Sequence, residues 1–272
     1  MVYAIKMLLI LYIHIHFNRI TSIMSRNEGL STRHNPEFTS IELYAAYTDY
    51  NYMQQLLEHL LHSLAQELLQ SSSVAYGDVV INMAPPFAKM TMANCVLKHT
   101  GVDMDRYVQQ GDHKEAYAQA IQLGLDAALV EKKTAGEILN VLFEEKCEHT
   151  LIQPTFILDH PIDTSPLAKA HRSKPGYVER FELYICGREI ANAYSELTDP
   201  VEQQARFARQ QEKRGQGDAE AWGGDEDFMN AMEMGLPPTG GMGIGIDRLV
   251  MLYTNSSTIR DVLAFPLLRK ES

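Results

Sequence analysis

The chain is poor in several features that mark specialised protein classes. Its 272 residues include one tryptophan and three cysteines, Cys95, Cys147 and Cys186. Three cysteines are too few for a disulfide scaffold, and no two of them have the short spacing of a zinc motif. We therefore interpret all three as buried apolar residues of a protein from a reducing compartment, and we predict a cytoplasmic location.

Positive charge is also scarce, with 24 Lys and Arg against 35 Asp and Glu and a formal net charge of −11. An extended nucleic-acid-binding face needs clustered basic side chains, so the composition argues against one but allows a small anion site. The apolar run at residues 7–15 is far shorter than the roughly 20 residues that cross a bilayer. Because no signal-peptide cleavage site follows it, we interpret the run as a buried strand or helix and expect no membrane partner.

A hydrophobic content of 45% is ordinary for a globular protein. Alternation of polar and apolar residues predicts a strand over 38–44, and leucines spaced three and four apart predict a helix over 51–70. We further expect a hairpin at 74–83 and two or three helices within 91–148. A strand at 153–158 and a hinged pair of strands at 180–197 follow. The remaining expected elements are helices at 200–214 and before 236, a loop at 215–225, a strand at 241–246 and a helix from 247. Strands interleaved with helices and hairpins indicate an α+β fold.

Three glycines alternate along the last predicted strand, in the segment GGMGIGIDRLVML. One face of that strand would carry no side chains at Gly241, Gly243 and Gly245, so a flat ligand such as a nucleobase could lie against its backbone. Arg248 falls in the first turn of the following helix, where a guanidinium and free N–H groups suit a phosphate. The alternative is a tight strand–helix junction packed under a neighbouring element.

A second segment, residues 26–50, is dense in ionisable side chains, namely Arg26, Glu28, Arg33, His34, Glu37, Glu42 and Asp49. Arg26 suits bidentate contact with a phosphate, and an aromatic ring at Phe38 could stack on a base. Glu42 and Tyr44 lie two apart and therefore share a face of the strand. The alternative is a solvated hairpin with incidental charge.

The third group lies in the hinged strands at 180–197. Glu182 and Glu189 would stand on adjacent strands near the turn, where two carboxylates repel unless a hard cation such as Mg²⁺ bridges them. Asn192, Tyr194 and Glu196 occupy every second position and share one face. Together with Glu42, these side chains suit an ammonium ligand. The alternative is an exposed acidic sheet edge.

The residues of these groups resemble those of a known family. RNEGLSTRHNPEFT followed by ELYAAYTDY is similar to motif 2 of the class II aminoacyl-tRNA synthetases, and GMGIGIDRLVML is similar to motif 3. The asparagine of RHNPEFT, the run IQPTFI with SPLAK, and FELYICGREIANAYSEL resemble the lysyl-tRNA synthetases in particular. The similarity extends from about residue 17 to residue 269.

The resemblance implies a six-stranded, mostly antiparallel class II sheet flanked by helices. It also implies that lysine reacts with ATP to give lysyl-adenylate, which then passes to the 3′ end of tRNA(Lys), with Mg²⁺ as the cofactor. The implied catalytic residues are Arg26 and Arg248. The implied ATP-binding residues are Arg26, His34, Asn35, Phe38, Gly243, Gly245 and Arg248. The implied lysine-binding residues are Glu28, Glu42, Tyr44, Asn192, Tyr194 and Glu196, and the implied metal ligands are Glu182 and Glu189.

Two parts of the family pattern are not recognisable in the sequence: the N-terminal OB-fold that reads the anticodon, and motif 1, which builds the family's homodimer. We therefore expect residues 1–25 to be a divergent segment and residues 26–272 to be an N-terminally truncated catalytic core, for which dimerisation is not predicted. The alternatives are a paralogue that lysylates a protein or only binds ATP and lysine, and an inactive fragment. An aspartyl or asparaginyl enzyme would need a cationic group where Glu42 and Glu196 stand.

Overall fold

The computed structural model describes residues 18–25, 31–32, 34–215 and 225–266. The predicted apolar run at 7–15 and most of the predicted loop at 215–225 lie outside these ranges. Among the described residues, no helix combines the length and apolar character needed to span a membrane.

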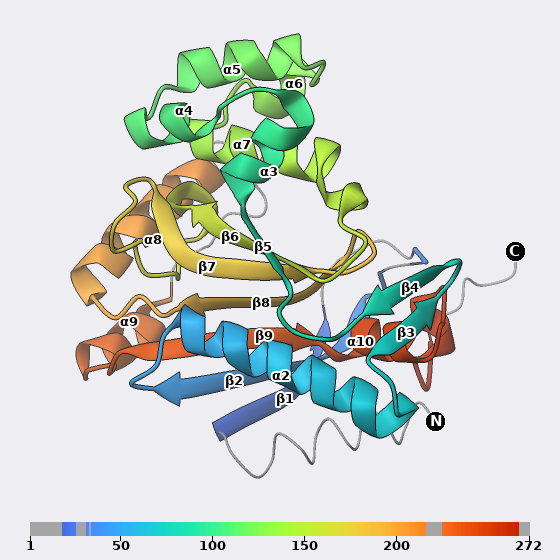
Figure 1. The fold of residues 1–272 in the computed structure, drawn as a ribbon. Helices are drawn as coiled ribbons and strands as arrows, with labels where there is room; N and C mark the ends of the chain where they lie inside the picture. Colours follow the sequence, from blue (N-terminus) through green and yellow to red (C-terminus); the bar gives the residue numbers. More distant parts are fainter. Residues whose placement is uncertain (1–17, 26–30, 33, 216–224, 267–272) are drawn as a thin grey trace, which may run out of the picture.

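A seven-stranded sheet forms the centre of the molecule (Figure 1). Its strand order is β1-β2-β9-β8-β7-β6-β5, where the strands are β1 (Asn18–Ser25), β2 (Glu37–Ala46), β9 (Thr239–Gly245), β8 (Glu189–Ser195), β7 (Tyr177–Tyr184), β6 (Thr155–Pro161) and β5 (Ala88–Thr91). Neighbouring strands are antiparallel except β5, which runs parallel to β6. The predicted α+β fold with a mostly antiparallel sheet is confirmed, and β5 adds a parallel edge to six antiparallel strands.

The order of the strands brings the three sequence groups together. The glycine-rich β9 pairs with β2 on one side and with β8 on the other, so segments from opposite ends of the chain become neighbours. The predicted hinged pair is β7 and β8, and its turn contains Cys186, which has a left-handed φ of 53°. Cys186 is only half-buried, which corrects the prediction of full burial, whereas Cys95 and Cys147 are buried as predicted.

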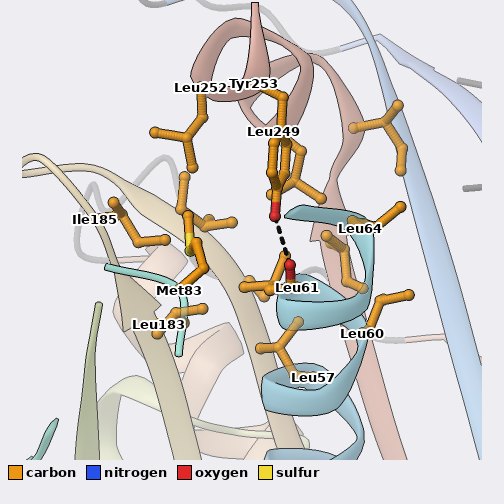
Figure 2. Packing of buried hydrophobic residues seen from close by; sticks show 14 of the residues in the cluster. Leu57, Leu60, Leu61, Leu64, Met83, Leu183, Ile185, Leu249, Leu252 and Tyr253 are labelled. Carbon is orange, nitrogen blue, oxygen red and sulfur yellow. Dashed lines mark hydrogen bonds between the residues drawn. The ribbon is translucent and has the colours of Figure 1, made fainter. Parts of the chain in front are cut away.

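Helix α2 (Tyr50–Leu69) covers one face of the sheet, close to its predicted range. It begins where the side chain of Asp49 accepts hydrogen bonds from the backbone N–H groups of the first turn. Its leucines pack against β7, the end of β4 and helix α10 (Ile246–Tyr253), as Figure 2 shows. The Tyr253 hydroxyl donates a 2.7 Å hydrogen bond to the carbonyl oxygen of Leu61. This packing fixes α10, and with it the end of β9, relative to the sheet.

The predicted hairpin is present as β3 (Ser73–Tyr76) and β4 (Val79–Asn82), with Gly77 in the left-handed region at a φ of 56°. The predicted C-terminal helices are also present, as α8 (Pro200–Gly215) and α9 (Glu226–Glu233), and α8 begins at the proline that follows Asp199. The N–H group of Val201 donates a 2.9 Å hydrogen bond to the Asp199 side chain.

A second apolar cluster lies in a helical layer at one end of the molecule. The prediction of two or three helices here is wrong, because the segment contains five: α3 (Met92–Thr100), α4 (Asp105–Gln110), α5 (His113–Gln122), α6 (Ala127–Val130) and α7 (Ala135–Lys146). Left-handed glycines at 101, 111 and 124 interrupt what the apolar pattern suggested were longer helices. The predicted start at Thr134 is confirmed, because Thr134 and Glu137 form a capping box.

Candidate active site

The middle of the sheet is open on one face because β9 carries glycine there. Gly243 pairs with Glu42 on β2 and Asn192 on β8, and Gly241 pairs in the same way with Tyr44 and Tyr194. At both levels of the sheet, a side chain of β2 and a side chain of β8 therefore flank a glycine of β9. The result is a trough that contributes to a cavity of about 330 Å³.

The trough carries two carboxylates. Glu42 and Glu196 line the same cavity, and the Tyr44 hydroxyl donates a 3.1 Å hydrogen bond to Glu42 Oε2. Glu196 Oε1 is buried and has no hydrogen-bond partner among the described residues. Burial and the negative charge of Glu42 raise the pKa of Glu196 to about 8. A cationic group placed here would relieve both causes, so this end of the cavity is suited to an amine.

The other end of the cavity has a different character. His34, Asn35 and Phe38 line it from the β2 side, and Arg248 lines it from the first turn of α10. Arg248 Nη1 donates a 2.6 Å hydrogen bond to the carbonyl oxygen of Glu189, which holds the guanidinium at the mouth. A guanidinium beside a helix N-terminus is a favourable environment for phosphate oxygens.

Two side chains stabilise this end from below. The Asn35 side chain is buried, and its amide donates a 2.6 Å hydrogen bond to the Glu37 carbonyl oxygen, while Oδ1 has no partner within the described part of the chain. Asp247 accepts a 2.6 Å hydrogen bond from the backbone N–H group of Thr39. That bond ties α10 to β2 directly under the cavity.

A second cavity of about 580 Å³ adjoins the first and shares His34, Glu189 and Arg248 with it. Glu182 lines only this second cavity. Glu182 and Glu189 lie on β7 and β8, the adjacent strands that the sequence predicted, on either side of the turn. Of the two predicted metal ligands, Glu189 therefore lies where the two cavities meet, and Glu182 lines the second cavity alone.

The chemistry of Glu182 fits a cation. Burial raises the pKa of the Glu182 carboxyl, but His160, Arg180 and a hydrogen bond from Tyr184 outweigh that effect and hold it below its ordinary value. The carboxylate accepts 2.5 Å and 2.6 Å hydrogen bonds from Arg180 Nη2 and the Tyr184 hydroxyl. An ionised carboxylate has about four lone-pair positions, so acceptor capacity remains for a hard ion such as Mg²⁺. Glu189 supplies a second carboxylate, whose Oε2 lies 3.6 Å from Arg248 Nη1.

Arg180 is a site residue that the sequence reasoning missed. Its Nε donates a 2.9 Å hydrogen bond to Asn192 Oδ1, and the same guanidinium holds Glu182. Its Nη1 also donates a 2.8 Å hydrogen bond to Ser165 Oγ. Arg180 thus joins Asn192, which lines the first cavity, to Glu182, one of the two predicted metal ligands. Its position two residues before Glu182 on a strand was the available signal, because residues i and i+2 share a face.

The structure places most of the predicted site residues around these two cavities. The predicted ATP and lysine residues that line the first cavity are His34, Asn35, Phe38, Gly243, Gly245, Arg248, Glu42, Tyr44, Asn192, Tyr194 and Glu196. Arg26, Glu28 and Arg33 lie outside the described residues.

Comparison with known proteins identifies the family of the chain. The family described as tRNA synthetases class II (D, K and N) matches residues 8–269. The chain belongs to this family. A lysine–tRNA ligase of Prochlorococcus marinus is 53% identical over 247 residues, which cover 91% of this chain and 49% of that protein. A lysine–tRNA ligase of Trichormus variabilis is 54% identical over 246 residues, which cover 90% of this chain and 43% of that protein.

The class II synthetase chain therefore spans about half the length of the relatives that it matches. The family match begins at residue 8, within the segment that we expected to be divergent. The boundary at residue 26 stays a prediction.

Proposed function

We propose that the chain activates lysine with ATP to form lysyl-adenylate and transfers the lysyl group to the 3′ end of tRNA(Lys), as a lysine–tRNA ligase. The observation that carries the proposal is the acidic pair Glu42 and Glu196 in one cavity with Arg248. That cavity offers anionic partners for an ammonium group at one end and a guanidinium for phosphate at the other. Relatives named as lysine–tRNA ligases support the same assignment.

In the proposed complex, the ammonium group of the lysine side chain lies between Glu42 and Glu196, with Tyr44 and Tyr194 as walls. Asn192, held by Arg180, faces the same ligand from β8. Glu28 contributes near the substrate amine. A shorter or uncharged side chain would leave the buried Oε1 of Glu196 without a cationic partner, and such a mismatch costs far more than a lost apolar contact.

ATP occupies the other end of the cavity. The adenine stacks between Phe38 and Arg248, and the ribose lies against the backbone at Gly243 and Gly245. A Cβ on Gly243 would have only the Asn192 carbonyl oxygen, 4.0 Å away, near it, so the space above this glycine is open to a ligand. His34 and Asn35 contact the nucleotide from the motif 2 loop, and Arg26 holds the α-phosphate.

The chemical step needs no protein nucleophile. The lysine carboxylate attacks the α-phosphorus of ATP, the bond to the β-phosphate oxygen breaks, and pyrophosphate leaves. The 3′-terminal hydroxyl of the tRNA then attacks the carbonyl carbon of the adenylate, and AMP leaves. Arg26 and Arg248 stabilise the phosphate charge, and the cavity holds the two reactants in line. Mg²⁺ held by Glu182 and Glu189 would supply further neutralisation of phosphate charge.

Lysine-dependent exchange between ATP and pyrophosphate tests the proposal. We expect exchange with the full chain and a strong loss in Glu196→Gln, through weaker binding of lysine rather than of ATP. Glu67→Gln, which removes an exposed carboxylate of α2, is the matched control and should keep full exchange. A folded chain that gives no exchange at millimolar lysine, or equal losses of lysine and ATP binding in Glu196→Gln, would contradict the assignment.

Charging of tRNA(Lys) is measured separately. Exchange accompanied by charging of tRNA(Lys) supports the complete proposal. The proposed function also includes a cytoplasmic location. Exchange accompanied by lysine transfer to a protein but not to tRNA would support the paralogue instead.

A further inference from the structure

Two cysteines and a histidine meet in the helical layer, and none of the three lines either cavity of the candidate active site. The Sγ atoms of Cys95 and Cys147 and a ring nitrogen of His99 all lie within 4.8 Å of one another. Cys95 and His99 are four residues apart on α3, and Cys147 caps the C-terminal end of α7. Helices α3 and α7 pack against each other (Figure 1), so the three side chains converge at a contact between two helices.

The spacing of the three side chains is close to that of a metal site. Zinc binds sulfur at about 2.3 Å and imidazole nitrogen at about 2.0–2.1 Å, so ligand atoms around one ion stand roughly 3.5–3.8 Å apart. The Sγ atom of Cys95 lies 3.9 Å from His99 Nδ1. Only small side-chain movements are therefore needed to close the three ligands around one ion.

The surroundings of His99 orient its ring. The Thr150 hydroxyl donates a 2.6 Å hydrogen bond to the Cys147 carbonyl oxygen, so its own oxygen can accept from His99 Nε2, which lies 3.0 Å away. A histidine that donates from one nitrogen to a neighbouring group presents the other to a metal, as ligating histidines commonly do. Nδ1 lies 2.8 Å from the Cys95 carbonyl oxygen, and binding of an ion exchanges that contact for a metal–nitrogen bond.

The three side chains differ in their exposure to solvent. Both cysteines are fully buried, whereas His99 is exposed, so an ion would enter from the side of the histidine. The interpretation of these two cysteines as simple core residues does not explain why the imidazole of His99 lies beside the sulfur of Cys95.

We propose that Cys95, His99 and Cys147 bind a thiophilic divalent transition-metal ion of the zinc type, which ties α3 to α7. Coordination releases the thiol protons to solvent, and nothing is oxidised or reduced. The site matters for the second cavity, because Glu144 on α7 and Glu148, which directly follows Cys147, line that cavity. A bound ion would therefore stabilise one of its walls.

The test uses the full chain, reduced, freed of metal with a chelator and titrated with Co²⁺ and then Zn²⁺. We expect one equivalent of Co²⁺ to give thiolate-to-cobalt charge-transfer absorption, and one equivalent of Zn²⁺ to abolish it. Cys186→Ser is the matched control, because it removes the cysteine outside the cluster, and it should behave as the unaltered chain does. Cys95→Ser should lose the absorption, and His99→Ala should weaken Co²⁺ binding by about tenfold or more.

Folding is monitored apart from metal binding. His99 is exposed, so His99→Ala should keep the circular dichroism and metal-free melting temperature of the unaltered chain. Zn²⁺ should raise the melting temperature of the unaltered chain and of Cys186→Ser, and it should do so less in His99→Ala. Absence of thiolate–cobalt absorption in the unaltered chain, its persistence in Cys95→Ser, or undiminished binding in a folded His99→Ala would each overturn the proposal. None of these readouts depends on lysine activation.

Discussion

The carboxylate of Glu196 fills the space beside Gly241 on the neighbouring strand. A Cβ on Gly241 would stand 2.0 Å from Glu196 Oε1 and 3.1 Å from Tyr44 Cε1. The glycine is therefore required by the position of the Glu196 side chain rather than by its own backbone conformation. The Glu196 carboxyl can lie at the acidic end of the cavity because β9 has no side chain at Gly241.

Substituting Gly241→Ala should displace Glu196 and weaken lysine binding. Overpacking of this kind costs roughly 1–3 kcal/mol, and we expect the lysine Kd to rise roughly tenfold or more. A Cβ on Gly245 would lie 3.7 Å from its nearest neighbours, so Gly245→Ala should leave lysine binding nearly unchanged. Calorimetric titration with lysine measures both variants. Equal affinities for lysine in the two variants would show that Glu196 is not held as described.

Lysine binding should depend on pH through Glu196. Because burial and Glu42 raise the pKa of Glu196 to about 8, its carboxyl is mostly protonated in the empty cavity at neutral pH. The ammonium of lysine favours the carboxylate, so binding should release a proton, and lysine affinity should rise with pH up to about 8 and then level off.

Calorimetry in two buffers with different ionisation enthalpies counts that proton. Glu196→Gln has no proton to release at this position, so its remaining lysine binding should give the same heat in both buffers. Proton uptake on binding, or a release that persists in Glu196→Gln, would be incompatible with the assigned role.

Arg180 should act on Asn192 and on the predicted metal ligand Glu182 together. The side chain of a lysine residue at position 180 cannot reach Asn192, Glu182 and Ser165 at once, because it lacks the planar fork of arginine. Arg180→Lys should therefore raise the lysine Kd by about tenfold and also raise the Mg²⁺ concentration that half-saturates pyrophosphate exchange. Arg209→Lys, an exposed change on α8, is the control and should alter neither value. A change in only one of the two values would show that Arg180 does not link them.

The packing of α2 should dominate the stability of the sheet. Leu61 is fully buried, and Leu61→Ala should lower the free energy of unfolding by about 2–5 kcal/mol, because the cavity it leaves is only partly refilled. Leu69, at the end of the same helix, is 37% exposed, and we expect Leu69→Ala to cost less than about 1 kcal/mol. Urea unfolding followed by circular dichroism gives both values. Similar losses would mean that α2 is not anchored as Figure 2 shows.

Local sequence patterns predicted the parts of the site that lie along single strands. The alternation of Asn192, Tyr194 and Glu196 and the glycines of β9 set which side chains share a face, since a strand repeats every two residues. Pairing between strands was not predictable in the same way. The link from Arg180 to Asn192 depends on the register of β7 with β8, which places Arg180 opposite Tyr194.

Contacts between helices that are distant in the sequence were harder still to predict. Cys95 and Cys147 come together only because α3 packs on α7, and the breaks at Gly111 and Gly124 that shape this layer are weak signals in an apolar pattern. The spacing of cysteines along the chain carries no information about such a contact.

Binding of lysine compared with norleucine tests the central claim most directly. Norleucine has the four side-chain carbons of lysine but lacks the ammonium nitrogen, so it would leave Glu42 and Glu196 without a cationic partner. Titration of the full chain should show lysine binding at least about a hundredfold tighter than norleucine, with the difference largely lost in Glu196→Gln. Equal affinities for the two amino acids in the unaltered chain would contradict the assignment of this cavity to an amine.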